Sequence, residues 1–365
     1  MSQSFNLHAA YNGLSFGNVS IALTREMLKR GLTPAIFPIG GQVDLATQKP
    51  DADFNQKLGH LINSAQQRAS RKSPTIKLWH IQDSLASYSE RGNDLLTFFE
   101  LDALTPSEVN ILRNQRRVYV TSTYTQQVFS QFGIQSIYLP IGFDSHNFLQ
   151  LPIRPKIVDP KAGPVTSFLM AGKLEKRKGH FQVLNLWAKR YGNKPQYRLN
   201  CAVHNPFLKQ EDMNAMIAQA LEGKTYWNIN WLPWSATNAE YNTVLQSSDI
   251  ILSCSGGEGR DLPCYHATAM GAHPIALRAH AYLDYLNDDN AILINPNGKT
   301  PAVDGVFFHG GQPFNQGNLF TFSPEDFYAA CDEAERRAKI GINLRGIELQ
   351  RKTYSEAVDI LLKDL

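Results

Sequence analysis

The sequence predicts an α/β protein built from two Rossmann-like domains. Short apolar runs alternate with helix-length segments from end to end, which is typical of mostly parallel sheets with helices on both faces. This alternation is interrupted once, by the proline-rich stretch 151–164, and then restarts. The length of 365 residues also fits two domains. We therefore expect domains at 1–150 and 165–344, a linker at 151–164, and a C-terminal helix at about 345–365 that packs back on the first domain.

The first half is expected to alternate strands and helices. The helix at 106–114 has the clearest start, because Thr105 can cap its first turn, Pro106 fits its first position and Glu108 completes a capping box. The other elements are assigned from their apolar periodicity. Strands are expected at 5–11, 33–38, 75–79, 95–99, 118–121 and 136–139, and the other helices at 18–30, 54–69 and 123–132.

The second half repeats the same pattern after the linker. Ser323 and Pro324, followed by two acidic residues, form a cap pattern that opens a helix ending at Ile340. A last amphipathic segment covers 344–362. Strands are expected at 166–171, 196–202, 226–231 and 249–253, and helices at 178–191, 211–221, 239–246 and 263–270.

The composition excludes several classes of protein. Hydrophobic residues make up 43% of the chain and charged residues 19%, which excludes a disordered chain. The net charge of +3 is weaker than the clustered basic excess of a nucleic-acid binder, so we expect no nucleic-acid partner. The four cysteines form no Cys-x-x-Cys pair, which favours a reduced, cytoplasmic setting. No signal peptide is expected, and no apolar run reaches the roughly 20 residues of a membrane helix.

A basic stretch without acidic residues lies between Asp53 and Asp83. It could contact an anionic membrane surface, but a solvated helix face is the favoured interpretation. The pair Asp51 and Asp53 is not interpreted as a metal site, because it follows Gln-Lys-Pro rather than an apolar strand. Asp53 is expected to cap a helix instead. We expect no bound metal and no cofactor.

The first candidate site is the segment Gly-Lys-Leu-Glu-Lys-Arg-Lys-Gly at 172–179, directly after an expected strand. Gly172 allows a tight turn there, and Lys173 and Lys178 would lie near the positive end of the next helix. This arrangement could hold a diphosphate. An exposed, charged loop is an equally good interpretation of the spacing alone. In the diphosphate interpretation, Lys178 should face solvent when no ligand is bound.

The second candidate site is the glycine-rich turn around Glu258, between an expected strand and a helix that opens near Leu262. The dipole of that helix would point at a bound anion. An ordinary strand–turn–helix connection is the alternative, but the gathering of glycines around one carboxylate favours function. The backbone N–H groups that could approach an anion are those of Gly256, Gly257 and Gly259.

Three segments of the first domain could face a ligand. Gly13 and Gly17 lie in a loop between the first strand and helix, although their spacing is not that of a dinucleotide-binding motif. Glu100 and Asp102 end a strand, where carboxylates can hold sugar hydroxyls or move a proton. His80 also ends a strand. For each segment, a structural role in a turn is at least as good an interpretation.

Taken together, these segments resemble the retaining GT-B glycosyltransferases of the glycosyltransferase group 1 family. The family motif Gly-Arg-(four residues)-Lys-Gly corresponds to the segment 172–179. The family stretch Glu-Gly-Phe-Gly-Leu-Pro-x-x-Glu-Ala corresponds to 258–267, and Asn-Gly-Val-Asp to 141–144. The resemblance spans nearly the whole chain. It implies the GT-B fold, with two Rossmann-like domains facing each other across a cleft.

The resemblance also implies a role for each candidate residue. Lys173, Lys178 and Glu258 would be catalytic, with the lysines on the donor diphosphate and Glu258 on the sugar. His80, Glu100 and Asp102 would lie on the acceptor side. The residues expected to bind the donor are Gly13, Gly17, Gly172, Gly256, Gly257, Gly259, Arg260, Leu262 and His266.

The chain departs from the family motifs at four positions. Lys173 stands where the family usually has Arg, which keeps the charge but loses the bidentate fork. Arg260 and Asp261 replace Phe-Gly. His266 replaces the Glu that holds the nucleotide ribose; a neutral imidazole can still accept one hydroxyl proton, so donor affinity should weaken when His266 is protonated.

The function that the resemblance implies is a metal-independent, hexosyltransferase-type glycosyltransferase. It would move a sugar from a nucleotide-diphosphate-sugar donor to a hydroxyl acceptor, a glycan, a lipid or another small molecule, with retention of the anomeric configuration. Two alternatives are open. One is another GT-B enzyme acting on nucleotide sugars, such as an epimerase or a phosphorylase. The other is a non-catalytic nucleotide-sugar-binding protein.

Overall fold

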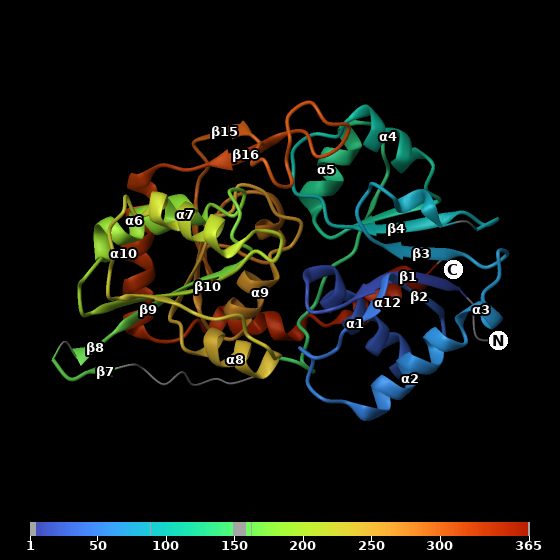
Figure 1. Ribbon diagram of the computed structural model, residues 1–365, viewed down its shortest axis with the longest axis horizontal. Helices are drawn as coiled ribbons and strands as arrows, with labels where there is room; N and C mark the ends of the chain where they lie inside the picture. Colours follow the sequence, from blue (N-terminus) through green and yellow to red (C-terminus); the bar gives the residue numbers. More distant parts are fainter. Residues whose placement is uncertain (1–4, 88, 149–157, 162, 364–365) are drawn as a thin grey trace. The chain divides into compact units, whose positions relative to one another are not determined.

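The computed structural model describes residues 5–87, 89–148, 158–161 and 163–363 (Figure 1). The chain folds into two units, each with its own six-stranded sheet. The first unit draws on Met1–Asn147, Gly310–Gly317 and Lys352–Leu365, and the second on Phe148–His309 and Asn318–Arg351. The chain therefore returns twice to the first unit after entering the second.

The first unit contains a parallel sheet with the strand order β2-β1-β3-β4-β5-β6. Each strand expected in this half is present, with ends shifted by a few residues. β2 continues to Val43, five residues past the expected end at Pro38. The strands are β1 (Asn6–Tyr11), β2 (Ala35–Val43), β3 (Thr75–Leu78), β4 (Asn93–Thr97), β5 (Arg117–Val120) and β6 (Ile137–Tyr138).

The helices of the first unit follow the expected pattern with one break and one shifted cap. Asp51, not the expected Asp53, caps α2 by accepting from the Phe54 N–H (3.0 Å). The helix expected at 54–69 is divided at Ser64 into α2 and α3. The capping box expected at Thr105 and Glu108 is present at the start of α4. Arg30 donates to the Ser355 carbonyl (2.7 Å) and pairs with Asp359, which fixes α12 against the end of α1. The helices are α1 (Ser15–Lys29), α2 (Ala52–Asn63), α3 (Ala65–Arg68), α4 (Pro106–Arg113), α5 (Thr123–Gln131) and α12 (Tyr354–Leu362).

The second unit contains a parallel sheet with the order β11-β10-β9-β12-β13-β14. Counted along the chain this is the order 3-2-1-4-5-6, that of a Rossmann sheet. β13, β14 and the antiparallel pair β15–β16 were not expected from the sequence. The strands are β9 (Thr166–Gly172), β10 (Tyr197–Val203), β11 (Ile229–Trp231), β12 (Ile250–Ser253), β13 (His273–Leu277), β14 (Ile292–Ile294), β15 (Gly298–Pro301) and β16 (Asn318–Thr321).

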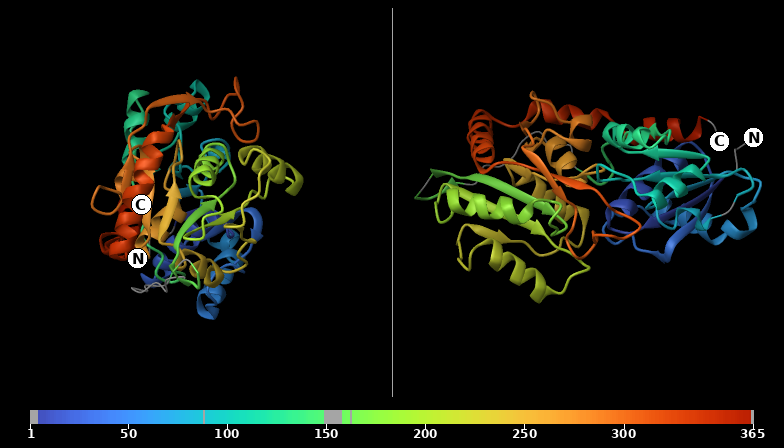
Figure 2. Two further views of the ribbon diagram at one scale, coloured as in Figure 1. Left: turned by 90° about the vertical axis from the view of Figure 1, so that its left-hand side faces the viewer. Right: turned by 90° about the horizontal axis from the view of Figure 1, so that it is seen from above.

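The helices of the second unit cover this sheet, as Figures 1 and 2 show. α6 and α10 pack against one another over the buried Trp187, and α9 packs against β9, β12 and β13. The side chain of Ser323 caps α10 as expected, and α10 ends at Ile340. The helices are α6 (His180–Tyr191), α7 (Gln210–Ala220), α8 (Asn238–Gln246), α9 (Leu262–Ala269), α10 (Pro324–Ile340) and the short α11 (Leu344–Ile347).

Two boundaries differ from the expected ones. The expected amphipathic segment 344–362 is divided into α11, a 3-10 turn at Glu348–Arg351, and α12, and only the last of these belongs to the first unit. Much of the expected linker, namely 151–157 and residue 162, lies outside the described residues. The remainder of it contains β7 (Val158–Asp159) and β8 (Gly163–Pro164), a small antiparallel pair. In the described part of the chain, no helix is long and apolar enough to cross a membrane.

The strand orders locate the switch point of each sheet, where successive connections run to opposite sides. In the first sheet it lies between β1 and β3, and in the second between β9 and β12. Ligands of open α/β sheets bind at the carboxyl ends of the strands at such points. The loops that follow β9 and β12 are therefore neighbours for a topological reason. They are also the two segments that the sequence singled out.

A glycine at the start of α6 is required by close packing. Gly179 has a φ of +70°, and a Cβ on this residue would lie 2.5 Å from the carbonyl oxygen of Cys254. Gly223 has the same φ of +70° but open space around it. Replacing Gly223 by alanine therefore measures the cost of the left-handed backbone alone. Replacing Gly179 by alanine measures the same cost plus that of the steric clash.

We expect Gly179→Ala to destabilise the protein more than Gly223→Ala. The control should lose about 1 kcal/mol, the cost of a left-handed alanine. Gly179→Ala should lose about 2 kcal/mol more, because the added methyl group forces the Cys254 loop to move. Urea unfolding followed by circular dichroism measures both values. Equal losses in the two variants would contradict the close approach.

Candidate functional site

The loops after β9 and β12 pack directly on one another. Gly172 ends β9 with a φ of +111°, and its Cα faces the Lys178 side chain and Pro263. The N–H of Gly256 donates to the Arg177 carbonyl (2.8 Å), and the Arg177 guanidinium donates to the Gly257 carbonyl (2.5 Å). The structure thus brings Gly172 and Lys178 together with the glycine-rich turn.

Six charged side chains fill the contact between these loops, and we call them the charge cluster. One oxygen of Glu258 lies 2.6 Å from Lys178 Nζ and 3.0 Å from the Arg177 guanidinium. Lys178 also lies 3.5 Å from Asp261. Arg177 and Lys173 both pair with Glu175, at 3.1 and 2.7 Å. The cluster comprises the cations Lys173, Arg177 and Lys178 and the anions Glu175, Glu258 and Asp261.

Opposite charges keep Glu258 and Lys178 ionised although both are buried. Burial of Glu258 opposes its ionisation, but Arg177 and Lys178 outweigh burial and lower its pKa to about 2. Burial favours neutral Lys178, but Asp261 and Glu258 raise the pKa of its ammonium group above the usual value. Burial raises the pKa of Asp261 despite the nearby Lys178. At neutral pH, Lys178 and Glu258 therefore form an ion pair.

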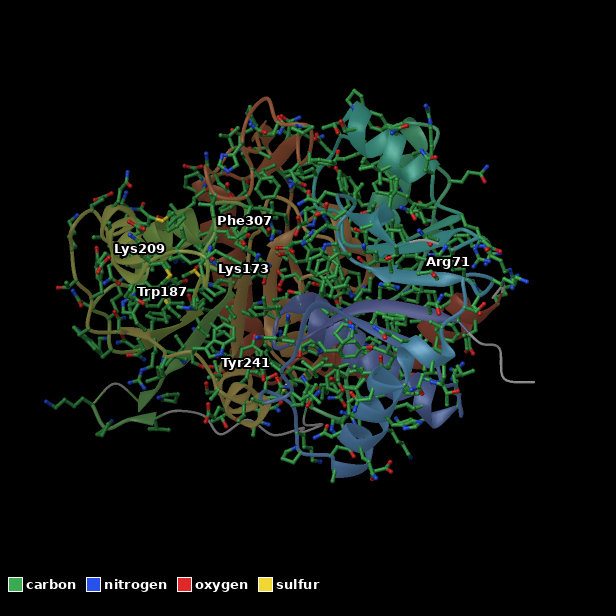
Figure 3. All side chains as sticks on the ribbon, turned by 45° about the vertical axis from the view of Figure 1, so that its right-hand side comes forward. Arg71, Lys173, Trp187, Lys209, Tyr241 and Phe307 are labelled. Carbon is green, nitrogen blue, oxygen red and sulfur yellow. The ribbon has the colours of Figure 1, made fainter. Side chains whose placement is uncertain are left out.

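The burial of Lys178 differs from the expectation that this side chain faces solvent. Its side chain is only 10% exposed, because Glu258 and Asp261 hold it against the sheet. Lys173 is the more accessible lysine. Its ammonium lies 4.6 Å from the ring centre of Phe307 and 5.8 Å from that of Phe207, and Figure 3 shows Lys173 beside Phe307.

The backbone conformation at Asp261 explains why the resembled motif has glycine at this position. Its φ of +50° is in the left-handed region, which Gly adopts most easily and Asp tolerates. The Asp261 side chain accepts from the Cys264 N–H (3.4 Å) and so caps α9, and it accepts from the Tyr282 hydroxyl (2.7 Å). The substitution therefore keeps the turn and adds a carboxylate next to Lys178.

Most of the other residues of this turn are buried, and their contacts in the structure are with other parts of the protein. The Gly256 N–H, expected to approach an anion, donates to Arg177 instead. A Cβ on Gly256 would lie 2.7 Å from the Phe320 carbonyl oxygen, so the glycine is needed for the approach of β16. Arg260 lies over the rings of Tyr265 and Tyr285, at 4.5 and 4.8 Å. Gly259 is buried and Leu262 is half-buried at the start of α9.

His266 lies on α9 and stacks on Phe148, with ring centres 3.7 Å apart and planes 14° apart. Burial, together with the nearby Arg260, lowers the pKa of its imidazole to about 3. The imidazole therefore stays neutral at mildly acidic pH. This corrects the expectation that protonation of His266 weakens ligand binding in that range, because the transition moves to about pH 3.

In the first unit, the loop after β1 owes its glycines to close packing. A Cβ on Gly17 would lie 2.2 Å from the Asn12 carbonyl oxygen, and one on Gly13 would lie 2.7 Å from the Thr47 methyl group. The Gly13 carbonyl accepts from the Asn18 side chain (2.9 Å). These contacts fix the loop at the switch point between β1 and β3.

The acceptor-side candidates lie near one another at the ends of β3 and β4. His80 and Glu100 line a hollow of about 20 Å³, together with Phe98 and Asn315. His80 also contacts Phe16, with ring centres 4.7 Å apart. Asp102 does not line the hollow and lies against Gly317 instead. The structure thus brings two of the three candidates together.

Some site residues escaped the sequence analysis. Glu175 and Arg177 lie inside the lysine-rich segment, and their alternating charges in a loop after a buried strand were the available signal. Asn315 gave no signal, because its partner Glu108 lies far away in the sequence. Within the described ranges, no group of three His, Cys, Asp or Glu side chains could hold a metal ion.

Comparison with known proteins identifies the fold. No family model matches the chain, and none of the curated proteins matches its sequence. Among solved structures, sucrose-phosphate synthase from Thermosynechococcus elongatus superposes with a TM-score of 0.67 at 11% identity, covering 99% of this chain and 98% of that one. The chain has the GT-B fold.

Two further GT-B structures support this assignment. Anabaena HepE, solved in complex with UDP-glucose, has a TM-score of 0.61 at 13% identity and covers 99% of this chain and 100% of its own. A glycosyltransferase from Rickettsia africae has a TM-score of 0.60 at 13% identity, covering 99% of this chain and 94% of that one. Both Rossmann-like units thus match the GT-B arrangement of two parallel sheets.

Acidification is expected to destabilise the second unit. Burial keeps three histidines neutral and lowers the pKa of His180 and His266 to about 3 and that of His280 to about 4. In the unfolded chain these groups bind protons near pH 6.5. Between about pH 6.5 and 4 the unfolded state therefore binds more protons, and the free energy of unfolding falls by about 1.4 kcal/mol per pH unit for each histidine. The contribution of Glu258 is lost only at lower pH, between about 4.5 and 2.

Urea unfolding at pH 7, 6 and 5 measures this slope. His266→Gln should reduce this slope by about 1.4 kcal/mol per pH unit, because one group fewer takes up a proton on unfolding. The lost stacking on Phe148 lowers stability equally at every pH and does not change the slope. His309→Gln is the control, since His309 is exposed in the same unit. An unchanged slope in His266→Gln would contradict the buried, neutral state of His266.

Proposed function

We propose that this protein is a retaining, metal-independent glycosyltransferase of the hexosyltransferase type. It would transfer a sugar from a nucleotide-diphosphate-sugar to a hydroxyl acceptor. The observation that carries the proposal is the buried Lys178–Glu258 pair at the carboxyl ends of β9 and β12. The GT-B structures that share this fold support it, because one was solved with UDP-glucose and another is a sucrose-phosphate synthase.

The donor diphosphate would lie at the charge cluster. Lys178 has three N–H donors, of which Glu258 and Asp261 engage two. The third donor and the accessible Lys173 would meet the phosphate oxygens, and the first turns of α6 and α9 add the positive ends of their dipoles. As the bond to the sugar breaks, the diphosphate becomes more negative. Fixed cations then stabilise the transition state more than the bound donor.

The other proposed roles follow from this placement. Glu258 is ionised, so its carboxylate can accept hydrogen bonds from hydroxyl groups of the donor sugar. The neutral imidazole of His266 would accept from a ribose hydroxyl. His80, Glu100 and Asp102 would contact the acceptor. Departure of the diphosphate on the same face as acceptor attack gives retention and needs no protein nucleophile. The four buried, free cysteines support a cytoplasmic site of action.

A second candidate function is that of a non-catalytic nucleotide-sugar-binding protein. Asp261 favours it, because this carboxylate competes with a diphosphate for Lys178. Calorimetry with UDP-glucose, paired with an assay for UDP release over a panel of sugar acceptors, separates the two. Binding without release for every acceptor would support the second candidate over the first.

We expect Lys178→Met to lower kcat by roughly 10²-fold or more, because the leaving diphosphate loses its closest cation. The buried Glu258 and Asp261 carboxylates also lose a partner, so stability should fall by about 3 kcal/mol. The assay is therefore run well below the unfolding transition. Lys176→Met is the control, since Lys176 is exposed on the same loop. Lys173→Arg should keep near-normal activity, and near-normal kcat in Lys178→Met would overturn the donor assignment.

Activity should persist in excess EDTA, because lysines take the place of a metal ion at the diphosphate. NMR of fresh product should show the anomeric configuration of the donor. Loss of activity in EDTA that added Mg²⁺ restores would contradict metal independence. An inverted product would contradict retention.

A further inference from the structure

The chain between β15 and β16 contributes a segment to the first unit. Residues Gly310–Gly317, which we call the strap, group with the first unit although the strands on either side belong to the second. Every strap residue is exposed or half-buried. The strap therefore buries little apolar surface, and a few polar contacts decide whether it stays in place.

Glu108 is the main attachment of the strap. One of its carboxylate oxygens closes the capping box of α4 by accepting from the Thr105 N–H (2.8 Å), and the other accepts from the Asn315 N–H (2.9 Å). Thr105 itself donates to the Pro313 carbonyl (2.6 Å). The Glu108 carboxylate is almost fully buried. A single side chain thus begins a helix and holds the strap.

The C-terminal end of the strap lies tightly on the turn after β4. A Cβ on Gly317 would lie 2.9 Å from an Asp102 carboxylate oxygen and 3.2 Å from Leu101 Cβ. A side chain at this position would press on Asp102 and Leu101, and the φ of +155° at Gly317 is one that other residues rarely adopt. The strap therefore contacts the same turn that carries the acceptor-side candidates Glu100 and Asp102.

The strap also lines the hollow at these candidates. Asn315 and Glu108 line it with His80 and Glu100. Its volume of about 20 Å³ holds roughly one water molecule and no sugar ring. With the strap attached, the hollow at His80 and Glu100 is thus too small for a sugar ring.

We propose that the strap is a gate that determines acceptor access: attached through Glu108 it closes the hollow at His80 and Glu100, and a sugar-sized acceptor enters only after it detaches. The identity of the ligand as an acceptor rests on the proposed function, whereas the closing of the hollow does not. Asn315 belongs to the strap and also lines the hollow. Its side chain would therefore contact an entering acceptor and select among acceptors.

Two variants detach the strap by different means. Glu108→Gln replaces one carboxylate oxygen by an NH₂ group, which is a donor only. The single remaining oxygen cannot accept from both the Thr105 N–H and the Asn315 N–H. Gly317→Ala adds a methyl group against Asp102. Glu240→Gln is the matched control, because Glu240 accepts from the Ala236 N–H (2.8 Å) in the equivalent cap of α8 and has no strap.

Hydrogen exchange and thiol labelling test the gate without any activity. The four native cysteines are buried, so Gln82→Cys places a single reactive thiol on the hollow. In Glu108→Gln and Gly317→Ala, amide exchange at 310–317 and labelling by a small methanethiosulfonate reagent should both rise at least 10-fold. Glu240→Gln should change neither. Unchanged labelling, with or without faster exchange, would overturn the gate.

Steady-state kinetics then test whether the gate controls the entry of an acceptor. With UDP-glucose as the donor and glucose as the acceptor probe, detaching the strap should lower the acceptor KM at least 5-fold and leave the donor KM unchanged. A higher acceptor KM would mean that the strap binds acceptor rather than excluding it, and would overturn the gate. If no acceptor of the sugar panel is consumed while labelling still rises, the proposed function fails and the gate over the hollow stands.

Discussion

The carboxylate of Glu258 holds the second unit's two functional loops together. One of its oxygens contacts both Arg177 and Lys178, which lie on the loop after β9, while Glu258 itself belongs to the loop after β12. Bringing the five buried charged groups of the cluster out of water is costly, and the cost is offset only when every group finds a partner. The shape of both loops and the first turns of α6 and α9 depend on this pairing. The same constraint fixes the ammonium group of Lys178 between Glu258 and Asp261.

The cluster contains three cations and three anions, so its positive charges are already paired with carboxylates before any anionic ligand is added. A diphosphate brings further negative charge and must compete with carboxylates for Lys178. Asp261 makes this competition stronger than in the resembled motif, where glycine stands at its position. Because burial already raises the pKa of Asp261, a bound anion nearby would favour its protonated form further. The site can thus adjust its own charge through one carboxyl group.

The sequence predicted the fold and the proximity of the loops after β9 and β12, because both follow from local patterns and from the topology of the sheet. The donor-binding role of these loops stays a prediction. Strands, caps and the start of α10 have local signals, and the topology of a parallel sheet brings the loops after β9 and β12 together. β13 was missed because its short apolar run follows α9 almost without a turn. The burial of Lys178 and the attachment of Asn315 to Glu108 depend on side-chain directions and on contacts between distant residues, which no local pattern carries.

The interleaved path of the chain determines the order in which the two units can be completed during synthesis. The first unit needs α12 to cover α1, and α12 follows every residue of the second unit along the chain. A ribosome therefore makes the whole of the second unit before the first has its last helix. Until then, the surface of α1 that carries Arg30 lacks its covering helix. The first unit therefore cannot complete its packing until the residues of α12 have been made.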